Sequence, residues 1–113
     1  MSVQQTNFNI IQGDTWSTYI TVTDSVGNLI NFTGYNFQME VKDRQGGNTV
    51  CATASLGNGI TVTGTGQIYV VLSSTQTSNF NLPQSVYQIV SISGSGYRTT
   101  LAQGWFQVTP SVF

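Results

Sequence analysis

Hydrophobic and polar residues alternate along most of this chain, with the two-residue period of β-strands that bury one face. The clearest run is residues 35–42, in which Tyr, Phe, Met and Val take every second position. A last strand is expected at 98–109, where Phe106 and Val108 share one face. Clusters of Gly, Asn, Asp and Ser interrupt the alternation roughly every 8–12 residues and predict turns between short strands.

This spacing predicts one all-β domain over residues 1–113. An immunoglobulin-like antiparallel β-sandwich of seven to eight strands fits best, because two packed sheets need many short strands joined by tight turns. A short apolar segment is also expected at 29–32, and Gly104 inside the last strand predicts a β-bulge. The main strands are expected at 8–12, 16–22, 35–42, 50–54, 60–62, 68–72, 87–92 and 98–109.

One short interruption of the strand pattern is expected to be helical. Ser73 precedes Gln76 by three residues, which is the spacing of a capping box. In that motif the two side chains satisfy each other's free backbone N–H groups at the start of a helix. We therefore expect a helical turn near 74–80 that ends before Pro83.

The chain carries very little charge. It has three Lys or Arg residues, four Asp or Glu residues and no His, so Ser, Thr, Asn and Gln must supply most of its polar surface. These side chains hydrogen-bond well, but a Ser nucleophile here would lack its usual His base. A surface poor in charge suits burial against other protein, because each unpaired buried charge costs several kcal/mol. We expect a structural or interaction protein and not an enzyme.

The same composition argues against several ligands. No cofactor or metal is expected, since the chain has a single cysteine, Cys51, no His and no Asp-rich calcium loop. Nucleic acid is not expected as a partner, because Lys42, Arg44 and Arg98 are the only cations that could meet phosphates. The sequence contains no targeting segment and no apolar run of the roughly 18 residues that a membrane span needs. We therefore expect no membrane partner and synthesis in a host cytoplasm.

We expect the residues that contact a partner to be aromatic, terminal or charged. Trp105 is expected on the outer face of the last strand, unless the domain covers both faces of that strand itself. Glu40 and Lys42 lie on the polar face of the 35–42 strand, where they either neutralise each other in solvent or pair with a neighbouring subunit. The full candidate set is Trp105, Phe113, Val112, Phe8, Tyr19, Tyr69, Glu40, Lys42 and Arg44.

The order of several short motifs resembles one bacteriophage domain family, the immunoglobulin-like N-terminal domain of phage baseplate upper proteins. The matching segments are 12–16, 21–28, 31–35, 57–62, 74–77, 86–87 and 104–110. Together they extend over about residues 5–112. The resemblance implies a non-enzymatic domain that docks onto the virion.

In that family, separate downstream segments form fibres or bind receptors, whereas this sequence ends with the domain. We therefore expect a structural protein of a tailed-phage virion that cements or decorates the capsid by burying surface between subunits. Its partners would be other virion proteins, and it would form a homo-oligomer such as a trimer. A tail or baseplate adaptor that anchors fibres is the alternative. A hypothesis of another class is a carbohydrate-binding module that stacks sugars on Trp105, Trp16 and the tyrosines.

Overall fold

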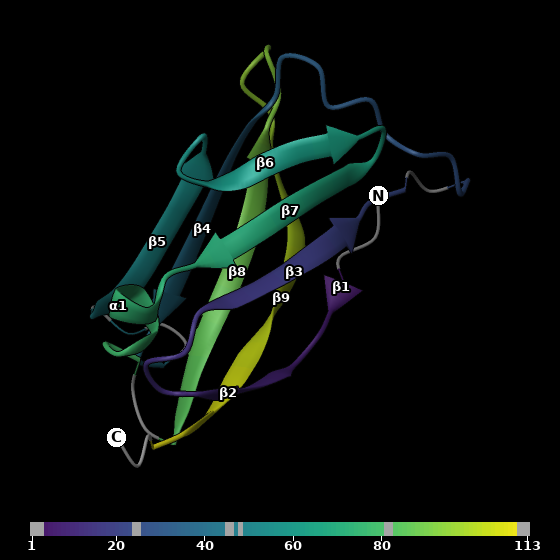
Figure 1. Ribbon diagram of the computed structural model, residues 1–113. Coiled ribbons are helices and arrows are strands. Elements are labelled where there is room, and N and C mark those ends of the chain that lie inside the picture. The colour runs from purple at the N-terminus through teal and green to yellow at the C-terminus, as the bar shows by residue number, and fades with distance from the viewer. Residues whose placement is uncertain (1–3, 24–25, 45–46, 48, 81–82, 111–113) are drawn as a thin grey trace.

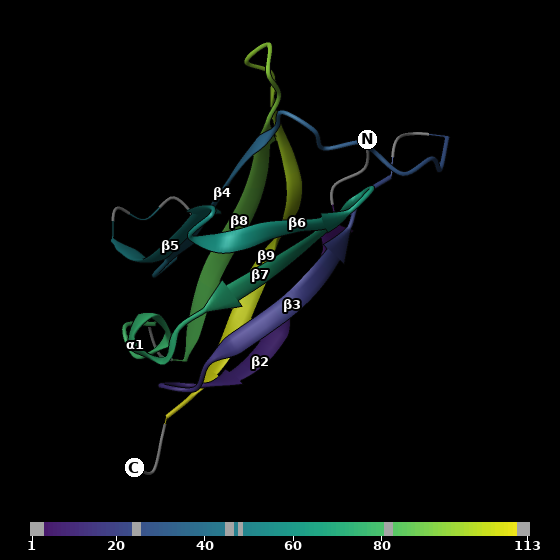
Figure 2. The same cartoon turned by 45° about the horizontal axis from the view of Figure 1, so that its top comes forward.

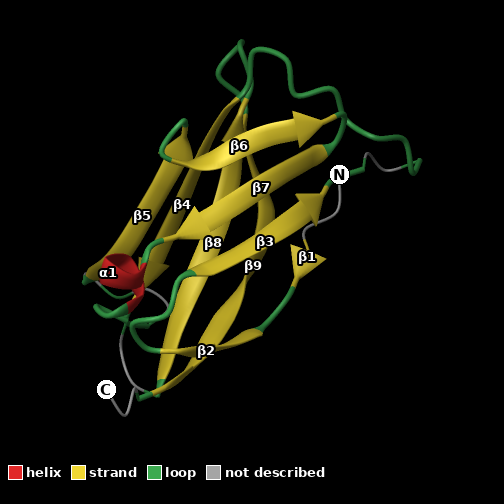
Figure 3. Cartoon of the chain, viewed as in Figure 1, coloured by secondary structure: helices red, strands yellow, loops and turns green. Residues whose placement is uncertain are grey.

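The computed structural model describes residues 4–23, 26–44, 47, 49–80 and 83–110. Within these ranges the chain forms nine strand segments and one helix of four residues (Figures 1 and 3). In chain order the elements are β1 (Gln4–Gln5), β2 (Phe8–Ile11), β3 (Trp16–Thr21), β4 (Asn36–Lys42), β5 (Val50–Leu56), β6 (Gly59–Gly64), β7 (Gln67–Leu72), α1 (Ser74–Thr77), β8 (Gln84–Ile92) and β9 (Arg98–Thr109). The predicted bounds of the last strand are confirmed. The segment at 29–32 forms no strand and contributes only a single bridge between Leu29 and Thr23.

The strands form one hydrogen-bonded sheet that folds over into two layers. Their order is β1-β9-β8-β4-β5-β6-β7-β3, and β2 continues along β9 beyond β1. Figures 1 and 2 show β3, β6 and β7 crossing in front of β8 and β9. Since β1 and β2 share one edge, the order has eight strand positions. The predicted immunoglobulin-like sandwich is therefore confirmed.

Three strand pairs are parallel, so the sandwich is not antiparallel throughout as predicted. β1 and β2 run parallel to β9, with Phe8 opposite Phe106. β5 and β6 are also parallel where Ser55 and Leu56 pair with Gly59 and Ile60. β2 and β3 stand at the two ends of the strand order, and their side chains Phe8 and Trp16 are in ring contact, so the sheet nearly closes into a barrel.

Side chains from both layers fill the space between them. Alternate residues of β4 and β7 point inward, as the alternation predicts. Those at most 1% exposed include Phe37, Met39, Val41, Ile68, Val70 and Leu72. Aromatic rings fill the seam between β2 and β3, where Trp16 packs edge-on against Phe8 and Phe106, with ring centroids 4.9 Å apart in both pairs. The half-buried thiol of Cys51 packs against the same core.

The bulge in β9 lies at Leu101 and not at Gly104, which corrects the prediction. Ile89 pairs with Ala102 and Val90 pairs with Thr100, so Leu101 is the extra residue, and its side chain is buried. Gly104 stays in register, but a Cβ there would overlap the carbonyl oxygen of Thr6. Glycine is required at this position because the segment joining β1 to β2 passes directly against it.

The capping box at α1 is confirmed. The Gln76 backbone N–H donates to Ser73 Oγ at 3.2 Å, and the Ser73 N–H donates to Gln76 Oε1 at 2.9 Å. Turn hydrogen bonds continue to Phe80, in agreement with the predicted span. Gln76 Nε2 also donates to the carbonyl oxygen of Thr53 at 2.7 Å, so the helix covers part of the outer edge of β5.

Candidate functional site

Two surfaces on opposite sides of the sandwich gather most of the predicted partner residues. The first is the outer surface of β3, β6 and β7, which we call the tyrosine face. It consists of Ser17, Tyr19, Thr21, Thr61, Thr63, Gln67, Tyr69 and Val71. Tyr19 lies opposite Tyr69 in the strand register, and their ring centroids are 4.5 Å apart. Tyr19 is 60% exposed, and no side chain of this face is charged.

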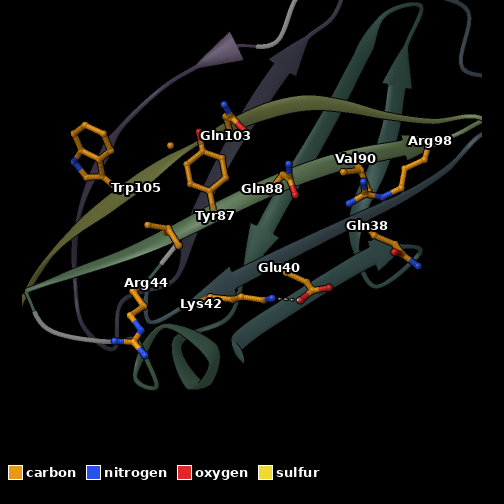
Figure 4. Close-up of a pocket in the computed structure, with 12 residues that line it drawn as sticks. Gln38, Glu40, Lys42, Arg44, Tyr87, Gln88, Val90, Arg98, Gln103 and Trp105 are labelled. Atoms are coloured by element: carbon orange, nitrogen blue, oxygen red, sulfur yellow. Dashed lines mark ion pairs between the residues drawn. The ribbon is translucent and has the colours of Figure 1, made fainter. Parts of the chain in front are cut away.

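The second surface is a groove of about 430 Å³ on the outer side of β4, β8 and β9, which we call the Trp105 groove (Figure 4). Hydrogen-bond register arranges the side chains of this surface in rows across the three strands. The rows are Lys42–Val86–Trp105, Glu40–Gln88–Gln103, Gln38–Val90–Thr100 and Asn36–Ile92–Arg98. The prediction that Trp105 points outward is confirmed, since its side chain is 41% exposed.

The bulge at Leu101 determines which residues of β9 face this groove. In an unbroken strand, Arg98 and Trp105 would point to opposite sides, because they are an odd number of residues apart. The extra residue restores the same side, so both side chains line the groove. An aromatic ring and a guanidinium therefore stand toward the two ends of one surface (Figure 4).

Charge is concentrated at the groove. All three cations of the chain, Lys42, Arg44 and Arg98, line it, together with one acid, Glu40. Lys42 Nζ lies 4.0 Å from Glu40 Oε2, and both side chains are partly exposed, so this pair contributes about 0–1 kcal/mol to stability. Two roles were predicted for Glu40 and Lys42, and the contact observed is the pair that they form with each other.

The floor of the groove is partly apolar. Val90 is only 4% exposed, although its row lies on the outer face and its side chain is not part of the central core cluster. Figure 4 shows the Arg98 side chain beside Val90. Gln88 lies in the neighbouring row, and its Nε2 donates to Thr100 Oγ1 at 3.2 Å. An apolar floor bordered by amides can pack against the apolar face of a ligand and hydrogen-bond to hydroxyl groups at its edge.

Several predicted site residues do not lie on either surface. Phe8 is half-buried and packs against Trp16, Tyr87 and Phe106, so the domain accounts for its apolar side chain without a partner. Trp16 is also partly buried and lies in the same cluster. The pairing of the N-terminal strand with β9 places both rings there, which argues against a partner role for Phe8 and a sugar platform at Trp16. Val112 and Phe113 lie outside the described residues.

Three groove residues were missed by the sequence analysis as site residues. Gln88 and Gln103 are ordinary polar residues of alternating strands, and nothing in their spacing marks them. Arg98 was noted only as a scarce cation, and its place opposite Ile92 depends on the bulge. The adjacent apolar residues Leu101 and Ala102 coincide with the bulge, but Trp105 and Phe106 are adjacent apolar residues without one, so the sequence does not locate the shift.

The described residues contain no group of three or more Cys, Asp or Glu side chains placed to hold a metal ion. Among the described elements, no helix is long and apolar enough to cross a membrane. A comparison with protein-family models and one with curated proteins each found no match to this chain.

Proposed function

We propose that this chain is a non-enzymatic structural protein of a tailed-phage virion, where it cements or decorates the capsid through the tyrosine face. The observation that carries the proposal is the contact of Tyr19 with Tyr69 at the centre of an uncharged sheet surface. Tyrosine is enriched where proteins meet, because it supplies a large apolar area and a polar tip at low entropic cost. Burying this face would desolvate no charge.

Groups that occupy the sheet edges favour attachment through the tyrosine face, because a partner strand could not pair with these edges directly. Phe8 on β2 and Trp16 on β3 pack against each other beside the outer edges of these two strands. Part of the β5 edge is occupied by the hydrogen bond from Gln76 to Thr53. A partner strand would have to displace these groups before it could pair, whereas the tyrosine face is already exposed.

The resemblance to phage baseplate domains supports a place on the virion, and burial between capsid subunits fits a homo-oligomer such as a trimer. A tail or baseplate adaptor that anchors fibres would use the same face against a different neighbour. The two locations are distinguished by imaging particles with and without the protein. A capsid role predicts added density on heads, and an adaptor role predicts it on tails.

The proposal is tested by adding the purified chain to particles that lack it. Wild-type chain should co-sediment with the particles and raise their resistance to heat and osmotic shock. Tyr19→Glu should lower co-sedimentation at least tenfold, because binding would then bury a charge. Trp105→Ala, on the opposite face, is the control and should bind as wild type. The proposal fails if the purified chain does not co-sediment with the particles, or if particles with and without it resist heat and osmotic shock equally.

A further inference from the structure

The Trp105 groove has the dimensions and chemistry of a ligand site, and the attachment role does not use it. Its volume of about 430 Å³ lies within the range of small-ligand sites, roughly 300–1,000 Å³. The groove and the tyrosine face lie on the outer sides of different layers, so each can be occupied without the other. We propose that the Trp105 groove binds a carboxylate-bearing oligosaccharide, with Trp105 stacked on a sugar ring and Arg98 paired with a carboxylate.

Trp105 supplies the stacking surface. Its indole is 41% exposed in the row that also contains Val86 and Lys42. A pyranose ring has an apolar face of C–H groups that covers an aromatic ring well, and a Trp side chain loses little entropy when it is covered. The half-buried Val86 beside it extends the apolar contact.

The amides of the groove match a ligand rich in hydroxyl groups. Gln38, Gln88 and Gln103 occupy two adjacent rows, and each amide offers both donors and an acceptor. A sugar hydroxyl also donates and accepts, so several geometries satisfy both partners. An extended peptide would instead need unpaired backbone groups along a strand edge, and this surface presents side chains of three paired strands.

The charge of the groove selects an anion. Three cations face a single acid, and that acid, Glu40, already lies 4.0 Å from Lys42. Within the described part of the chain, Arg98 and Arg44 form no ion pair with an acid. An arginine guanidinium pairs with a carboxylate through two parallel hydrogen bonds, which gives both affinity and orientation.

The length of the groove requires an oligomer. The Arg98 side chain lies beside Val90, whose row is four β4 residues from the row of Trp105, a separation of about 13 Å at about 3.3 Å per residue. A single acidic sugar cannot stack on the indole and reach the guanidinium at this separation, whereas a short oligosaccharide can. Monomeric uronic acid should therefore bind much more weakly than its trimer.

The experiment titrates the full chain with trigalacturonate, a mannuronate trimer, an α2,8-linked sialic acid trimer and neutral galactotriose, followed by calorimetry and tryptophan fluorescence. At least one acidic trimer should bind saturably and at least tenfold more tightly than the neutral one. Trp105→Ala should abolish binding and the fluorescence change. Arg98→Gln should weaken the acidic trimer about ten- to a hundredfold and leave the neutral one unchanged.

Two controls keep the outcome decisive. Tyr19→Ala changes the opposite face and should bind the acidic trimer as wild type. A hexaglutamate peptide tests for an acidic protein segment as the true occupant. No saturable binding to any acidic trimer, equal affinity for acidic and neutral trimers, or tighter binding of hexaglutamate would each overturn the proposal. Should Trp105→Ala fail to fold, Arg98→Gln still tests it through the acidic-to-neutral ratio.

Discussion

The phenol of Tyr87 donates a hydrogen bond of 2.6 Å to the backbone carbonyl of Thr6, 81 residues away in sequence. This contact ties the segment between β1 and β2 to the centre of β8. The Tyr87 ring also packs against Phe8 and Phe106, with centroids 5.8 Å and 5.1 Å away. A side-chain hydrogen bond and an aromatic cluster therefore help to hold the N-terminal edge of the sheet at the same place.

Removing the Tyr87 hydroxyl should destabilise the domain without unfolding it. Tyr87→Phe keeps the ring packing but leaves the Thr6 carbonyl without this donor, so the free energy of unfolding should fall by about 0.5–1.5 kcal/mol. Urea denaturation measures the change. Tyr97→Phe is a matched control, because Tyr97 is 77% exposed. Equal losses in the two variants would contradict this role for the Tyr87 hydroxyl.

Stability should also decline in alkali because of Tyr87. Burial raises the pKa of this phenol from its ordinary value of 10.0 to about 12, since the phenolate is disfavoured away from water. The unfolded chain therefore releases this proton at lower pH than the folded protein does. The contribution of Tyr87 is fully present below pH 10 and is lost as pH rises through about 12, by about 2–3 kcal/mol in all.

The measurement compares denaturation of wild type and Tyr87→Phe at steps between pH 9 and pH 12. The stability advantage of wild type over Tyr87→Phe should fall across this interval and reverse toward pH 12, because only wild type carries the titrating phenol. Other ionising groups are common to both proteins and cancel. A constant difference at every pH would refute the assignment.

A side chain at Gly104 should be poorly tolerated. Gly104→Ala would place a methyl group on the Thr6 carbonyl oxygen, so either β9 or the incoming segment must shift. We expect a loss of about 1–3 kcal/mol, read from thermal unfolding. Gly64→Ala in β6 is the control, because a Cβ there meets no atom within 4 Å, and it should stay within about 0.5 kcal/mol of wild type. If both substitutions cost the same, close approach is not the reason for glycine at 104.

The capping box predicts an order of stability among three variants of α1. Ser73→Ala removes the acceptor of the Gln76 N–H and should cost about 1 kcal/mol. Gln76→Ala should cost more, because Gln76 also donates to Thr53 on β5. Ser74→Ala, at an exposed helical position, should be nearly neutral. Chemical denaturation of the three variants tests the order, and a Gln76→Ala loss no larger than that of Ser73→Ala would exclude a contribution from the link to β5.

Local pattern was enough to predict most of the fold. The alternation of residues 35–42, the spacing of Ser73 and Gln76, and the outward side chain of Trp105 are each confirmed. These features depend on neighbours within a few positions, where strand period and capping chemistry act directly. The sequence was sufficient wherever the deciding contact is local.

The failures involve contacts between distant segments. Phe8 and Trp16 were expected to be available to partners or sugars, but the parallel pairing of β2 with β9 encloses both in one aromatic cluster. The Trp105 groove was missed because the bulge at Leu101 changes which residues of β9 share a face. A shift of one residue reverses every later side chain, and no periodicity reveals where such a shift occurs.

The near-closure of the sheet determines how crowded copies of this domain behave. In a sandwich with two long unpaired borders, strands of neighbouring copies can pair border to border and form fibrils. Here Phe8 on β2 packs against Trp16 on β3, and a glutamine from α1 occupies part of the β5 border. Copies at high local concentration can therefore stack as whole domains, each keeping its own hydrogen bonds, and need not form amyloid.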